Sequence, residues 1–127
     1  MPDLFINGSW QSARRGATRT IHCPADGSLV ATVDEADADD TEAAIHAARA
    51  AFDHGPWPTT SPAERGALLA RVADLLDKHR DEFARAESLD TGKRYVESQY
   101  DLDDVIAVFR YYAELAAVDD SRPVEVA

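Results

Sequence analysis

Residues 61–93 constrain the fold most, because they carry a helix start, a periodic body and a helix end. Ser61 can accept a hydrogen bond from a first-turn amide, Pro62 stands where its missing N–H costs nothing, and Glu64 can bond back to the Ser61 amide. Gly92 can adopt the left-handed conformation that ends helices. The pattern predicts one amphipathic helix about 45 Å long. Its apolar positions recur at intervals of three and four residues: Leu68, Val72, Leu75, Leu76, His79 and Phe83.

The segment before this helix is predicted to be extended. Two short apolar runs flank Asn7-Gly8, which predicts a tight hairpin with Trp10 packed in it. Residues 18–23 and 28–33 flank a Pro-Ala-Asp-Gly turn and predict an antiparallel ribbon. Such a ribbon needs a helix or a larger sheet to lie on.

Two further amphipathic helices are predicted. Acidic residues 34–40 lead into an alanine-rich segment that should form a helix ending near Gly55. A third helix should begin near Tyr95 and break at 119–123, and residues 124–126 have the pattern of a starting strand. We therefore expect an antiparallel β ribbon followed by three amphipathic helices.

Composition excludes several classes of protein. A chain of 127 residues with 45% hydrophobic residues fits one globular domain with a modest core. The net charge of -11 disfavours nucleic acid and anionic membrane surfaces as partners. Neither a membrane-spanning run nor a secretory signal is apparent, so we expect a cytoplasmic protein. The single cysteine, Cys23, excludes an intrachain disulfide.

Motifs for chemistry are scarce. The glycines form no phosphate-binding loop, and the histidines are too scattered for a metal site. His79 is expected to be a hydrogen-bonded core residue and Cys23 a structural or semi-buried thiol. The pair Arg14-Arg15 is interpreted as an exposed loop, because two charges alone make no anion site. The acidic run 34–42 lacks the ligand order of a calcium loop and fits a solvated helix start.

Seven motifs in order resemble the N-terminal portion of the NAD(P)-dependent aldehyde dehydrogenases. They are Leu-Phe-Ile-Asn-Gly-Ser-Trp from residue 4, Cys-Pro-Ala-Asp-Gly from 23, Ala-Thr-Val from 31, Ala-Ala-Arg-Ala-Ala-Phe from 47, Ser-Pro-Ala-Glu-Arg from 61, Leu-Asp-Thr-Gly-Lys from 89 and Phe-Arg-Tyr-Tyr-Ala from 109. The resemblance implies an α/β parent fold with a Rossmann-like cofactor domain. Residues 1–127 would be a single incomplete domain, and 122–127 would start the crossing to the oligomerisation strands.

The resemblance also implies that the chemistry lies elsewhere. The family's catalytic cysteine, general-base glutamate, oxyanion-hole asparagine and cofactor-binding lysine all fall beyond this chain, and the family's cysteine motif does not match around Cys23. We therefore expect no catalytic and no cofactor-binding residue here. NAD or NADP would bind only to the complete enzyme.

Two candidate sites follow from the resemblance. Many relatives hold a monovalent cation, K⁺ or Na⁺, with the aspartate that corresponds to Asp90 and with backbone carbonyls at the positions of Ile21 and His22. The alternative is that Asp90 caps backbone amides at a helix end. The asparagine common in the family's Asn-Pro turn is Cys23 here, which weakens the turn's side-chain bonding.

The second candidate site is the mouth of the aldehyde tunnel, which the resemblance assigns to Tyr100, Asp101 and Asp104. Residues 100 and 104 share a helix face, and residue 101 can converge on the same opening. Carboxylates and an aromatic ring there would favour a cationic aldehyde, namely an aminoaldehyde or a betaine aldehyde. The alternative is that these acidic residues belong to a solvated helix start.

Three hypotheses for function remain open. The chain is the N-terminal portion of an aldehyde dehydrogenase, inactive alone; or a non-catalytic helical module that binds a partner through its apolar face; or one half of a split enzyme. The partner in the first and third cases is the rest of the enzyme or a complementing chain. We also expect that the chain can form a homo-oligomer, because its apolar faces lack the sheet that would cover them.

Overall fold

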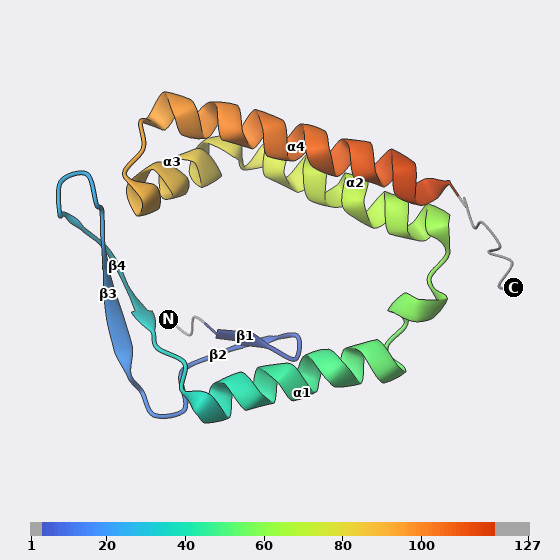
Figure 1. The fold of residues 1–127 in the computed structure, drawn as a ribbon, viewed down its shortest axis with the longest axis horizontal. Coiled ribbons are helices and arrows are strands. Elements are labelled where there is room, and N and C mark those ends of the chain that lie inside the picture. The colour runs from blue at the N-terminus through green and yellow to red at the C-terminus, as the bar shows by residue number, and fades with distance from the viewer. Residues whose placement is uncertain (1–3, 119–127) are drawn as a thin grey trace, which may run out of the picture. The chain divides into compact units, whose positions relative to one another are not determined.

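The computed structural model describes residues 4–118, and their contacts divide the chain into two compact units (Figure 1). Unit 1 runs up to Thr59 and includes Ser88–Lys93; unit 2 contains Thr60–Glu87 and the residues from Arg94 onward. The expected break at 119–123, the strand at 124–126 and the crossing at 122–127 lie outside the described residues. Each unit is described by itself below.

Unit 1 begins with a hairpin of β1 (Leu4–Ile6) and β2 (Ser9–Gln11), paired antiparallel as predicted. Asn7 and Gly8 both have positive φ angles, 52° and 78°, which is the backbone of a two-residue hairpin turn. The rings of Phe5 and Trp10 lie 5.1 Å apart. Trp10 is nevertheless 64% exposed, so the prediction that it is packed was wrong: its ring contact is with Phe5, which is itself 59% exposed.

The ribbon of unit 1 consists of β3 (Thr18–His22) and β4 (Leu29–Asp34), which pair antiparallel with an irregularity between Ile21 and His22. The turn between them is closed by Gly27, whose amide donates to the Cys23 carbonyl at 2.8 Å and whose φ is 74°. The ribbon is confirmed. The described strands form two separate two-stranded sheets, so residues 4–118 contribute no parallel sheet.

Helix α1 (Ala38–His54) starts on a reciprocal cap, in which Asp37 accepts from the Asp40 amide and the Asp40 carboxylate accepts from the Asp37 amide. The same carboxylate also accepts a hydrogen bond from the Arg14 amide at 3.2 Å. Asp40 is buried, with 6% of its surface exposed. Arg15 pairs with Asp37 at 2.8 Å. The arginine loop is exposed, as predicted, but its arginines also hold the helix start.

The prediction of one helix over 61–93 was wrong. Helix α2 (Pro62–Lys78) starts on the predicted Ser61–Glu64 cap and stops at His79, whose φ and ψ are -106° and 19°. Helix α3 (Arg80–Thr91) then begins with acidic residues in its first turn, which favour a helix start. His79 is exposed and contacts Glu82 at 3.2 Å, so it is not the expected core histidine. A short 3₁₀ turn, η1 (Trp57–Thr59), precedes α2.

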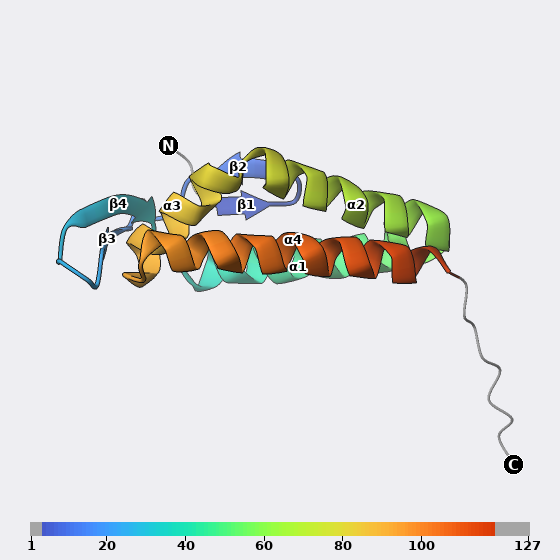
Figure 2. The ribbon, with the colours of Figure 1, turned by 90° about the horizontal axis from the view of Figure 1, so that it is seen from above.

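Helix α4 (Tyr95–Ala117) begins at the predicted residue and lies along α2 (Figures 1 and 2). The contact is close at Gly66, where an added Cβ would lie 2.5 Å from the Ala113 carbonyl oxygen. Two ion pairs, Arg110–Asp77 at 2.9 Å and Arg80–Asp103, join α4 to α2 and α3. Four α-helices thus stand among residues 4–118 where three were expected.

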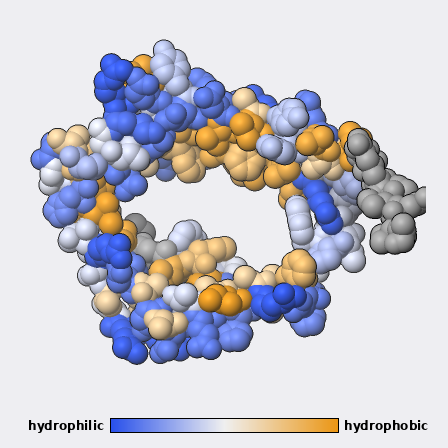
Figure 3. Space-filling model, viewed as in Figure 1, coloured by the Kyte–Doolittle hydropathy of each residue, from blue (hydrophilic) through white to orange (hydrophobic). Residues whose placement is uncertain are grey.

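The apolar interior is small. The buried apolar residues of both units are mostly small: Ala13, Cys23, Ala73, Ala84, Leu102, Ile106 and Ala113. Many larger apolar side chains stay at the surface, and Figure 3 shows them gathered along the helices of unit 2. No helix in the part of the chain that the structure describes is long and apolar enough to span a bilayer.

Candidate functional site

The end of α3 lies against the turn that follows β3. Gly92 closes the helix with a φ of 73°, and an added Cβ there would lie 2.9 Å from both the Ala25 amide nitrogen and Pro24 Cγ. Only glycine fits, because a side chain would need both the left-handed backbone and space that the turn occupies. This close approach brings the helix end that carries Asp90 next to the segment that follows Ile21 and His22.

The hydrogen bonds around this helix end involve neighbouring side chains. Ser88 Oγ donates to the Lys93 carbonyl at 2.8 Å, and the Lys93 amide donates to Thr91 Oγ1 at 3.4 Å. The ring Nδ1 of His22 lies 3.1 Å from the Gly27 carbonyl oxygen. Asp90 itself is exposed. No group of three His, Cys, Asp or Glu side chains between residues 4 and 118 has metal-binding geometry, so a cation here would depend on backbone oxygens.

Cys23 is a structural residue of the turn, as predicted. It is 6% exposed, and its amide donates to the Ser28 carbonyl at 2.9 Å. The neighbouring Asp26 accepts from the Ser28 amide at 2.9 Å and from the Ser28 hydroxyl at 2.7 Å. These bonds to Ser28 lower the pKa of the Asp26 carboxyl below its usual value. Asp26 thus supplies side-chain bonding to this turn, which sequence reasoning missed.

The candidate tunnel-mouth residues lie on α4, and Tyr100 and Asp104 lie on its side away from α2. Leu102 and Ile106 are buried, whereas Tyr100 is 62% exposed and Asp104 is also exposed. Asp101 is half-buried. The structure thus places the aromatic ring and the Asp104 carboxylate on one accessible face of the helix.

Arg80, at the start of α3, was not singled out from the sequence. Its guanidinium pairs with the Asp103 carboxylate and donates to the Gln99 carbonyl at 3.4 Å. The pair neutralises one carboxylate beside the candidate tunnel-mouth residues and fixes α3 against this part of α4. A sequence gives no sign of it, because the partners are far apart in the chain.

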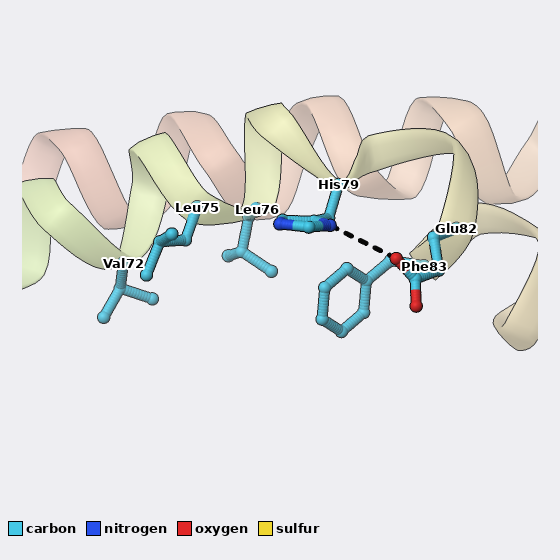
Figure 4. A pocket seen from close by; sticks show the side chains of 6 residues that line it. All are labelled: Val72, Leu75, Leu76, His79, Glu82 and Phe83. Atoms are coloured by element: carbon cyan, nitrogen blue, oxygen red, sulfur yellow. Dashed lines mark hydrogen bonds and ion pairs between the residues drawn. The ribbon is translucent and has the colours of Figure 1, made fainter.

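Unit 2 also carries an apolar groove of about 490 Å³ on α2 and the first turn of α3. Figure 4 shows its side chains projecting to the same side of the two helices, with the His79–Glu82 contact at one end. The lining residues are Val72, Leu75, Leu76, His79, Glu82 and Phe83.

Comparison with known proteins decides the family. The sequence profile of the aldehyde dehydrogenase family matches residues 10–126. The chain belongs to this family. This aldehyde dehydrogenase chain is 46% identical over 116 residues to betaine aldehyde dehydrogenase of Bacillus subtilis, covering 91% of the chain and 24% of the relative. It is 43% identical to a mitochondrial benzaldehyde dehydrogenase of Antirrhinum majus, covering 87% of the chain and 21% of the relative.

The fold of a solved relative agrees with this assignment. Betaine aldehyde dehydrogenase of Staphylococcus aureus in complex with NAD⁺ superposes with a TM-score of 0.92 at 37% identity, over 99% of this chain and 25% of that one. The aldehyde dehydrogenase chain therefore corresponds to the N-terminal portion of such enzymes and spans about a quarter of their length. The resemblance drawn from the seven motifs is confirmed.

Proposed function

We propose that the chain is the N-terminal portion of an NAD(P)-dependent aldehyde dehydrogenase that oxidises an aldehyde to a carboxylic acid, and that it is inactive alone. The observation that carries the proposal is the agreement in fold with the NAD⁺-bound Staphylococcus aureus enzyme over 99% of this chain. On this proposal, residues 1–127 form one incomplete domain that the rest of the enzyme completes, and the protein is cytoplasmic.

The starts of α1 and α2 do not fit the phosphates of the cofactor. A helix N-terminus binds phosphate through free amides, but these two starts are occupied by their own side chains, Asp37 with Asp40 and Ser61 with Glu64. No glycine-rich phosphate loop is present in the sequence either. The proposal therefore assigns NAD or NADP binding to the remaining portion of the enzyme.

The test is a hybrid enzyme in which these residues replace the matching portion of the Bacillus subtilis relative. We expect the hybrid to oxidise betaine aldehyde with NAD⁺, and the remaining portion of that relative to be inactive without this chain. A hybrid that folds but lacks activity would overturn the proposal.

For the substrate, we propose a preference for a cationic aldehyde, such as an aminoaldehyde or a trimethylammonio aldehyde. The accessible Tyr100 and Asp104 on one face of α4 support it, since carboxylates attract a cation and a ring adds a cation–π contact. Identity over a quarter of the enzyme does not decide the matter, because the benzaldehyde dehydrogenase is nearly as similar.

Asp101→Ala and Asp104→Ala variants of the hybrid would test this preference. We expect each change to lower kcat/KM for the cationic aldehyde and to leave that of a neutral aldehyde of equal length unchanged. If the preference for the cationic aldehyde survives both changes, or is absent at the outset, the result would favour the alternative that these acidic residues belong to a solvated helix start.

For the cation, we propose that Asp90 and the carbonyls of Ile21 and His22 contribute to a K⁺ or Na⁺ site in the completed enzyme. The packing of Gly92 against Ala25 supports it by joining the two segments. In the hybrid, Asp90→Ala should reduce the stabilisation that K⁺ gives against thermal unfolding, compared with Asp81→Ala at the other end of α3. An unchanged K⁺ response would favour a capping role for Asp90.

A separate observation favours a different class of function. The apolar side chains exposed on α2 and α4 also suit a helical module that binds a partner, or one half of a split enzyme. The split enzyme would regain activity when this chain and the remaining portion are supplied as two chains, whereas a binding module would not.

A further inference from the structure

Arg80, the first residue of α3, contacts α4 at two points that lie one helical turn apart. Its guanidinium pairs with the Asp103 carboxylate and donates to the Gln99 carbonyl oxygen at 3.4 Å. The Arg80 side chain is 36% exposed, and its Nε atom is buried without a hydrogen-bond partner among the residues that the structure describes. A side chain held at two points and partly buried is better ordered than one in an exposed surface ion pair. Arg80 therefore ties α3 to one defined turn of α4.

This turn borders the side of α4 that carries Tyr100 and Asp104, which we call the candidate cation face. Successive residues of a helix are about 100° apart around its axis, so Asp103 lies between the buried Leu102 and the exposed Asp104. Tyr100 is exposed on the same side as Asp104, four residues before it. The points that Arg80 contacts thus lie beside the candidate cation face without being part of it.

Two other polar contacts hold α4 on either side of this turn. The Tyr95 hydroxyl donates to the Asp81 carboxylate at 3.3 Å and fixes the first residue of α4 to α3. Arg110 pairs with Asp77 of α2 at 2.9 Å, more than one turn after the candidate cation face. Arg80 reaches the turn between these two contacts, so its loss would free the part of α4 that carries the face.

We propose that Arg80 is a positioning residue for the candidate cation face, and that it determines how well this face binds a cationic aldehyde. It holds the carbonyl that precedes Tyr100 and the carboxylate that precedes Asp104, so it fixes the aromatic ring and the acceptor carboxylate relative to α3. Cation–π and carboxylate contacts to one cation require both groups in place at the same time. The role in substrate binding rests on the proposed function.

The test uses the hybrid enzyme and a double substitution that leaves its net charge unchanged. Arg80→Met/Asp103→Ala removes one positive and one negative charge together with the contact between them. The substrates are betaine aldehyde and its neutral isostere, in which a tert-butyl group replaces the trimethylammonio group. We expect the ratio of kcat/KM for betaine aldehyde to kcat/KM for the isostere to fall about five-fold or more, through a higher KM for betaine aldehyde, because displaced binding groups lose affinity.

The matched control is Arg110→Met/Asp77→Ala, which removes another ion pair of α4 with the same residue changes. It should change the ratio by less than about two-fold, because it lies outside the turn that Arg80 holds. Arg80→Lys keeps the charge but loses the planar fork, so its ratio should lie between those of the parent and the double variant. In the 127-residue chain, amide hydrogens at 99–104 should exchange faster in the Arg80→Met/Asp103→Ala variant and not in the control.

Other results would overturn the proposal. An equal fall in kcat/KM for both aldehydes would show that the pair has a structural role only, as would unchanged hydrogen exchange at 99–104. If Arg80→Met alone raises the ratio and the double variant matches the parent, the pair acts through its charge and not through position. A parent hybrid without activity would count against the proposed function, whereas an active, cation-preferring parent whose ratio the double variant leaves unchanged would count against Arg80 alone.

Discussion

Gly66 lies where α2 approaches α4 closely in unit 2. Alanine would ordinarily favour a helix over glycine, yet here its Cβ would meet the Ala113 carbonyl oxygen at 2.5 Å and the Ala117 Cβ at 3.0 Å. Both neighbours belong to a helix of 23 residues, which cannot shift locally without loss of its other contacts. The glycine is therefore a packing residue.

We expect Gly66→Ala to lower the free energy of unfolding by about 1–3 kcal/mol, because overpacking separates α2 from α4. Urea unfolding followed by circular dichroism at 222 nm measures the change. Ala67→Ser, at the exposed neighbouring position, is the matched control and should change stability by less than about 0.5 kcal/mol. A Gly66→Ala variant that is more stable than the parent would show that helix propensity outweighs the close contact.

Individual residues were predicted best where the signal was local. The Ser61–Glu64 cap and the left-handed Gly92 depend only on residues close together in the chain, and both are confirmed. His79 was misplaced because its apolar spacing is that of a core position, whereas the backbone turns at this residue and leaves its ring exposed. Partners distant in the chain, such as Arg80 and Asp103, leave no local pattern to detect.

At the level of elements, the starts of α1 and α2 depend on ionised carboxylates. Hydrogen bonds from the Asp40 amide lower the pKa of Asp37, and those from Ser61 lower the pKa of Glu64, below ordinary values of 3.8 and 4.5. A carboxyl whose pKa is lower in the folded state stabilises that state above its ordinary pKa. The contribution is lost as the pH falls through the lowered value.

We therefore expect helix content to fall as the pH is lowered below the ordinary values of these carboxyls. The variant Asp37→Asn/Glu64→Gln keeps hydrogen-bonding side chains at both caps but cannot ionise there. Circular dichroism at 222 nm between neutral and acidic pH should show a smaller loss in the variant than in the parent. Parallel curves for the two proteins would indicate that other carboxylates set the acid response.

The break between α2 and α3 shows where element prediction failed. The apolar spacing continues across it from Leu75 through His79 to Phe83, and neither glycine nor proline marks the junction. The end of α2 is instead associated with contacts from α4 to Arg80, which a periodic pattern cannot encode. The hairpin turn at Asn7-Gly8 was predictable because positive φ angles demand those residue types.

At the level of the whole molecule, the described residues include more exposed large apolar side chains than buried apolar ones. We expect the isolated chain to self-associate at micromolar concentration, because α3 and α4 leave large side chains such as Phe83, Tyr112 and Leu115 about half exposed. Sedimentation velocity over a range of concentrations measures this. A concentration-independent monomer with a cooperative thermal transition would contradict the expectation.

The family could be recognised from the sequence because seven short motifs keep their order along nearly the whole chain. The strands and the outer limits of the helical region were predictable from turn and capping residues. The geometry of the candidate sites could not be predicted from such local signals. Asp90 is linked to the segment after Ile21 and His22 by the contact of Gly92 with Ala25, and only a three-dimensional structure reveals that contact.

The reciprocal caps of α1 and α2 are each made within four consecutive residues. Arg14 and Arg15, which also contact the start of α1, precede it in the chain, so neither helix start needs a later segment and both can form soon after these residues leave the ribosome. In an enzyme about four times as long as the segment matched here, synthesis of the remainder at roughly 5–20 residues per second takes tens of seconds. On the proposed function, we expect the nascent chain to display these helices with their apolar sides exposed during that interval, when ribosome-associated chaperones can bind them.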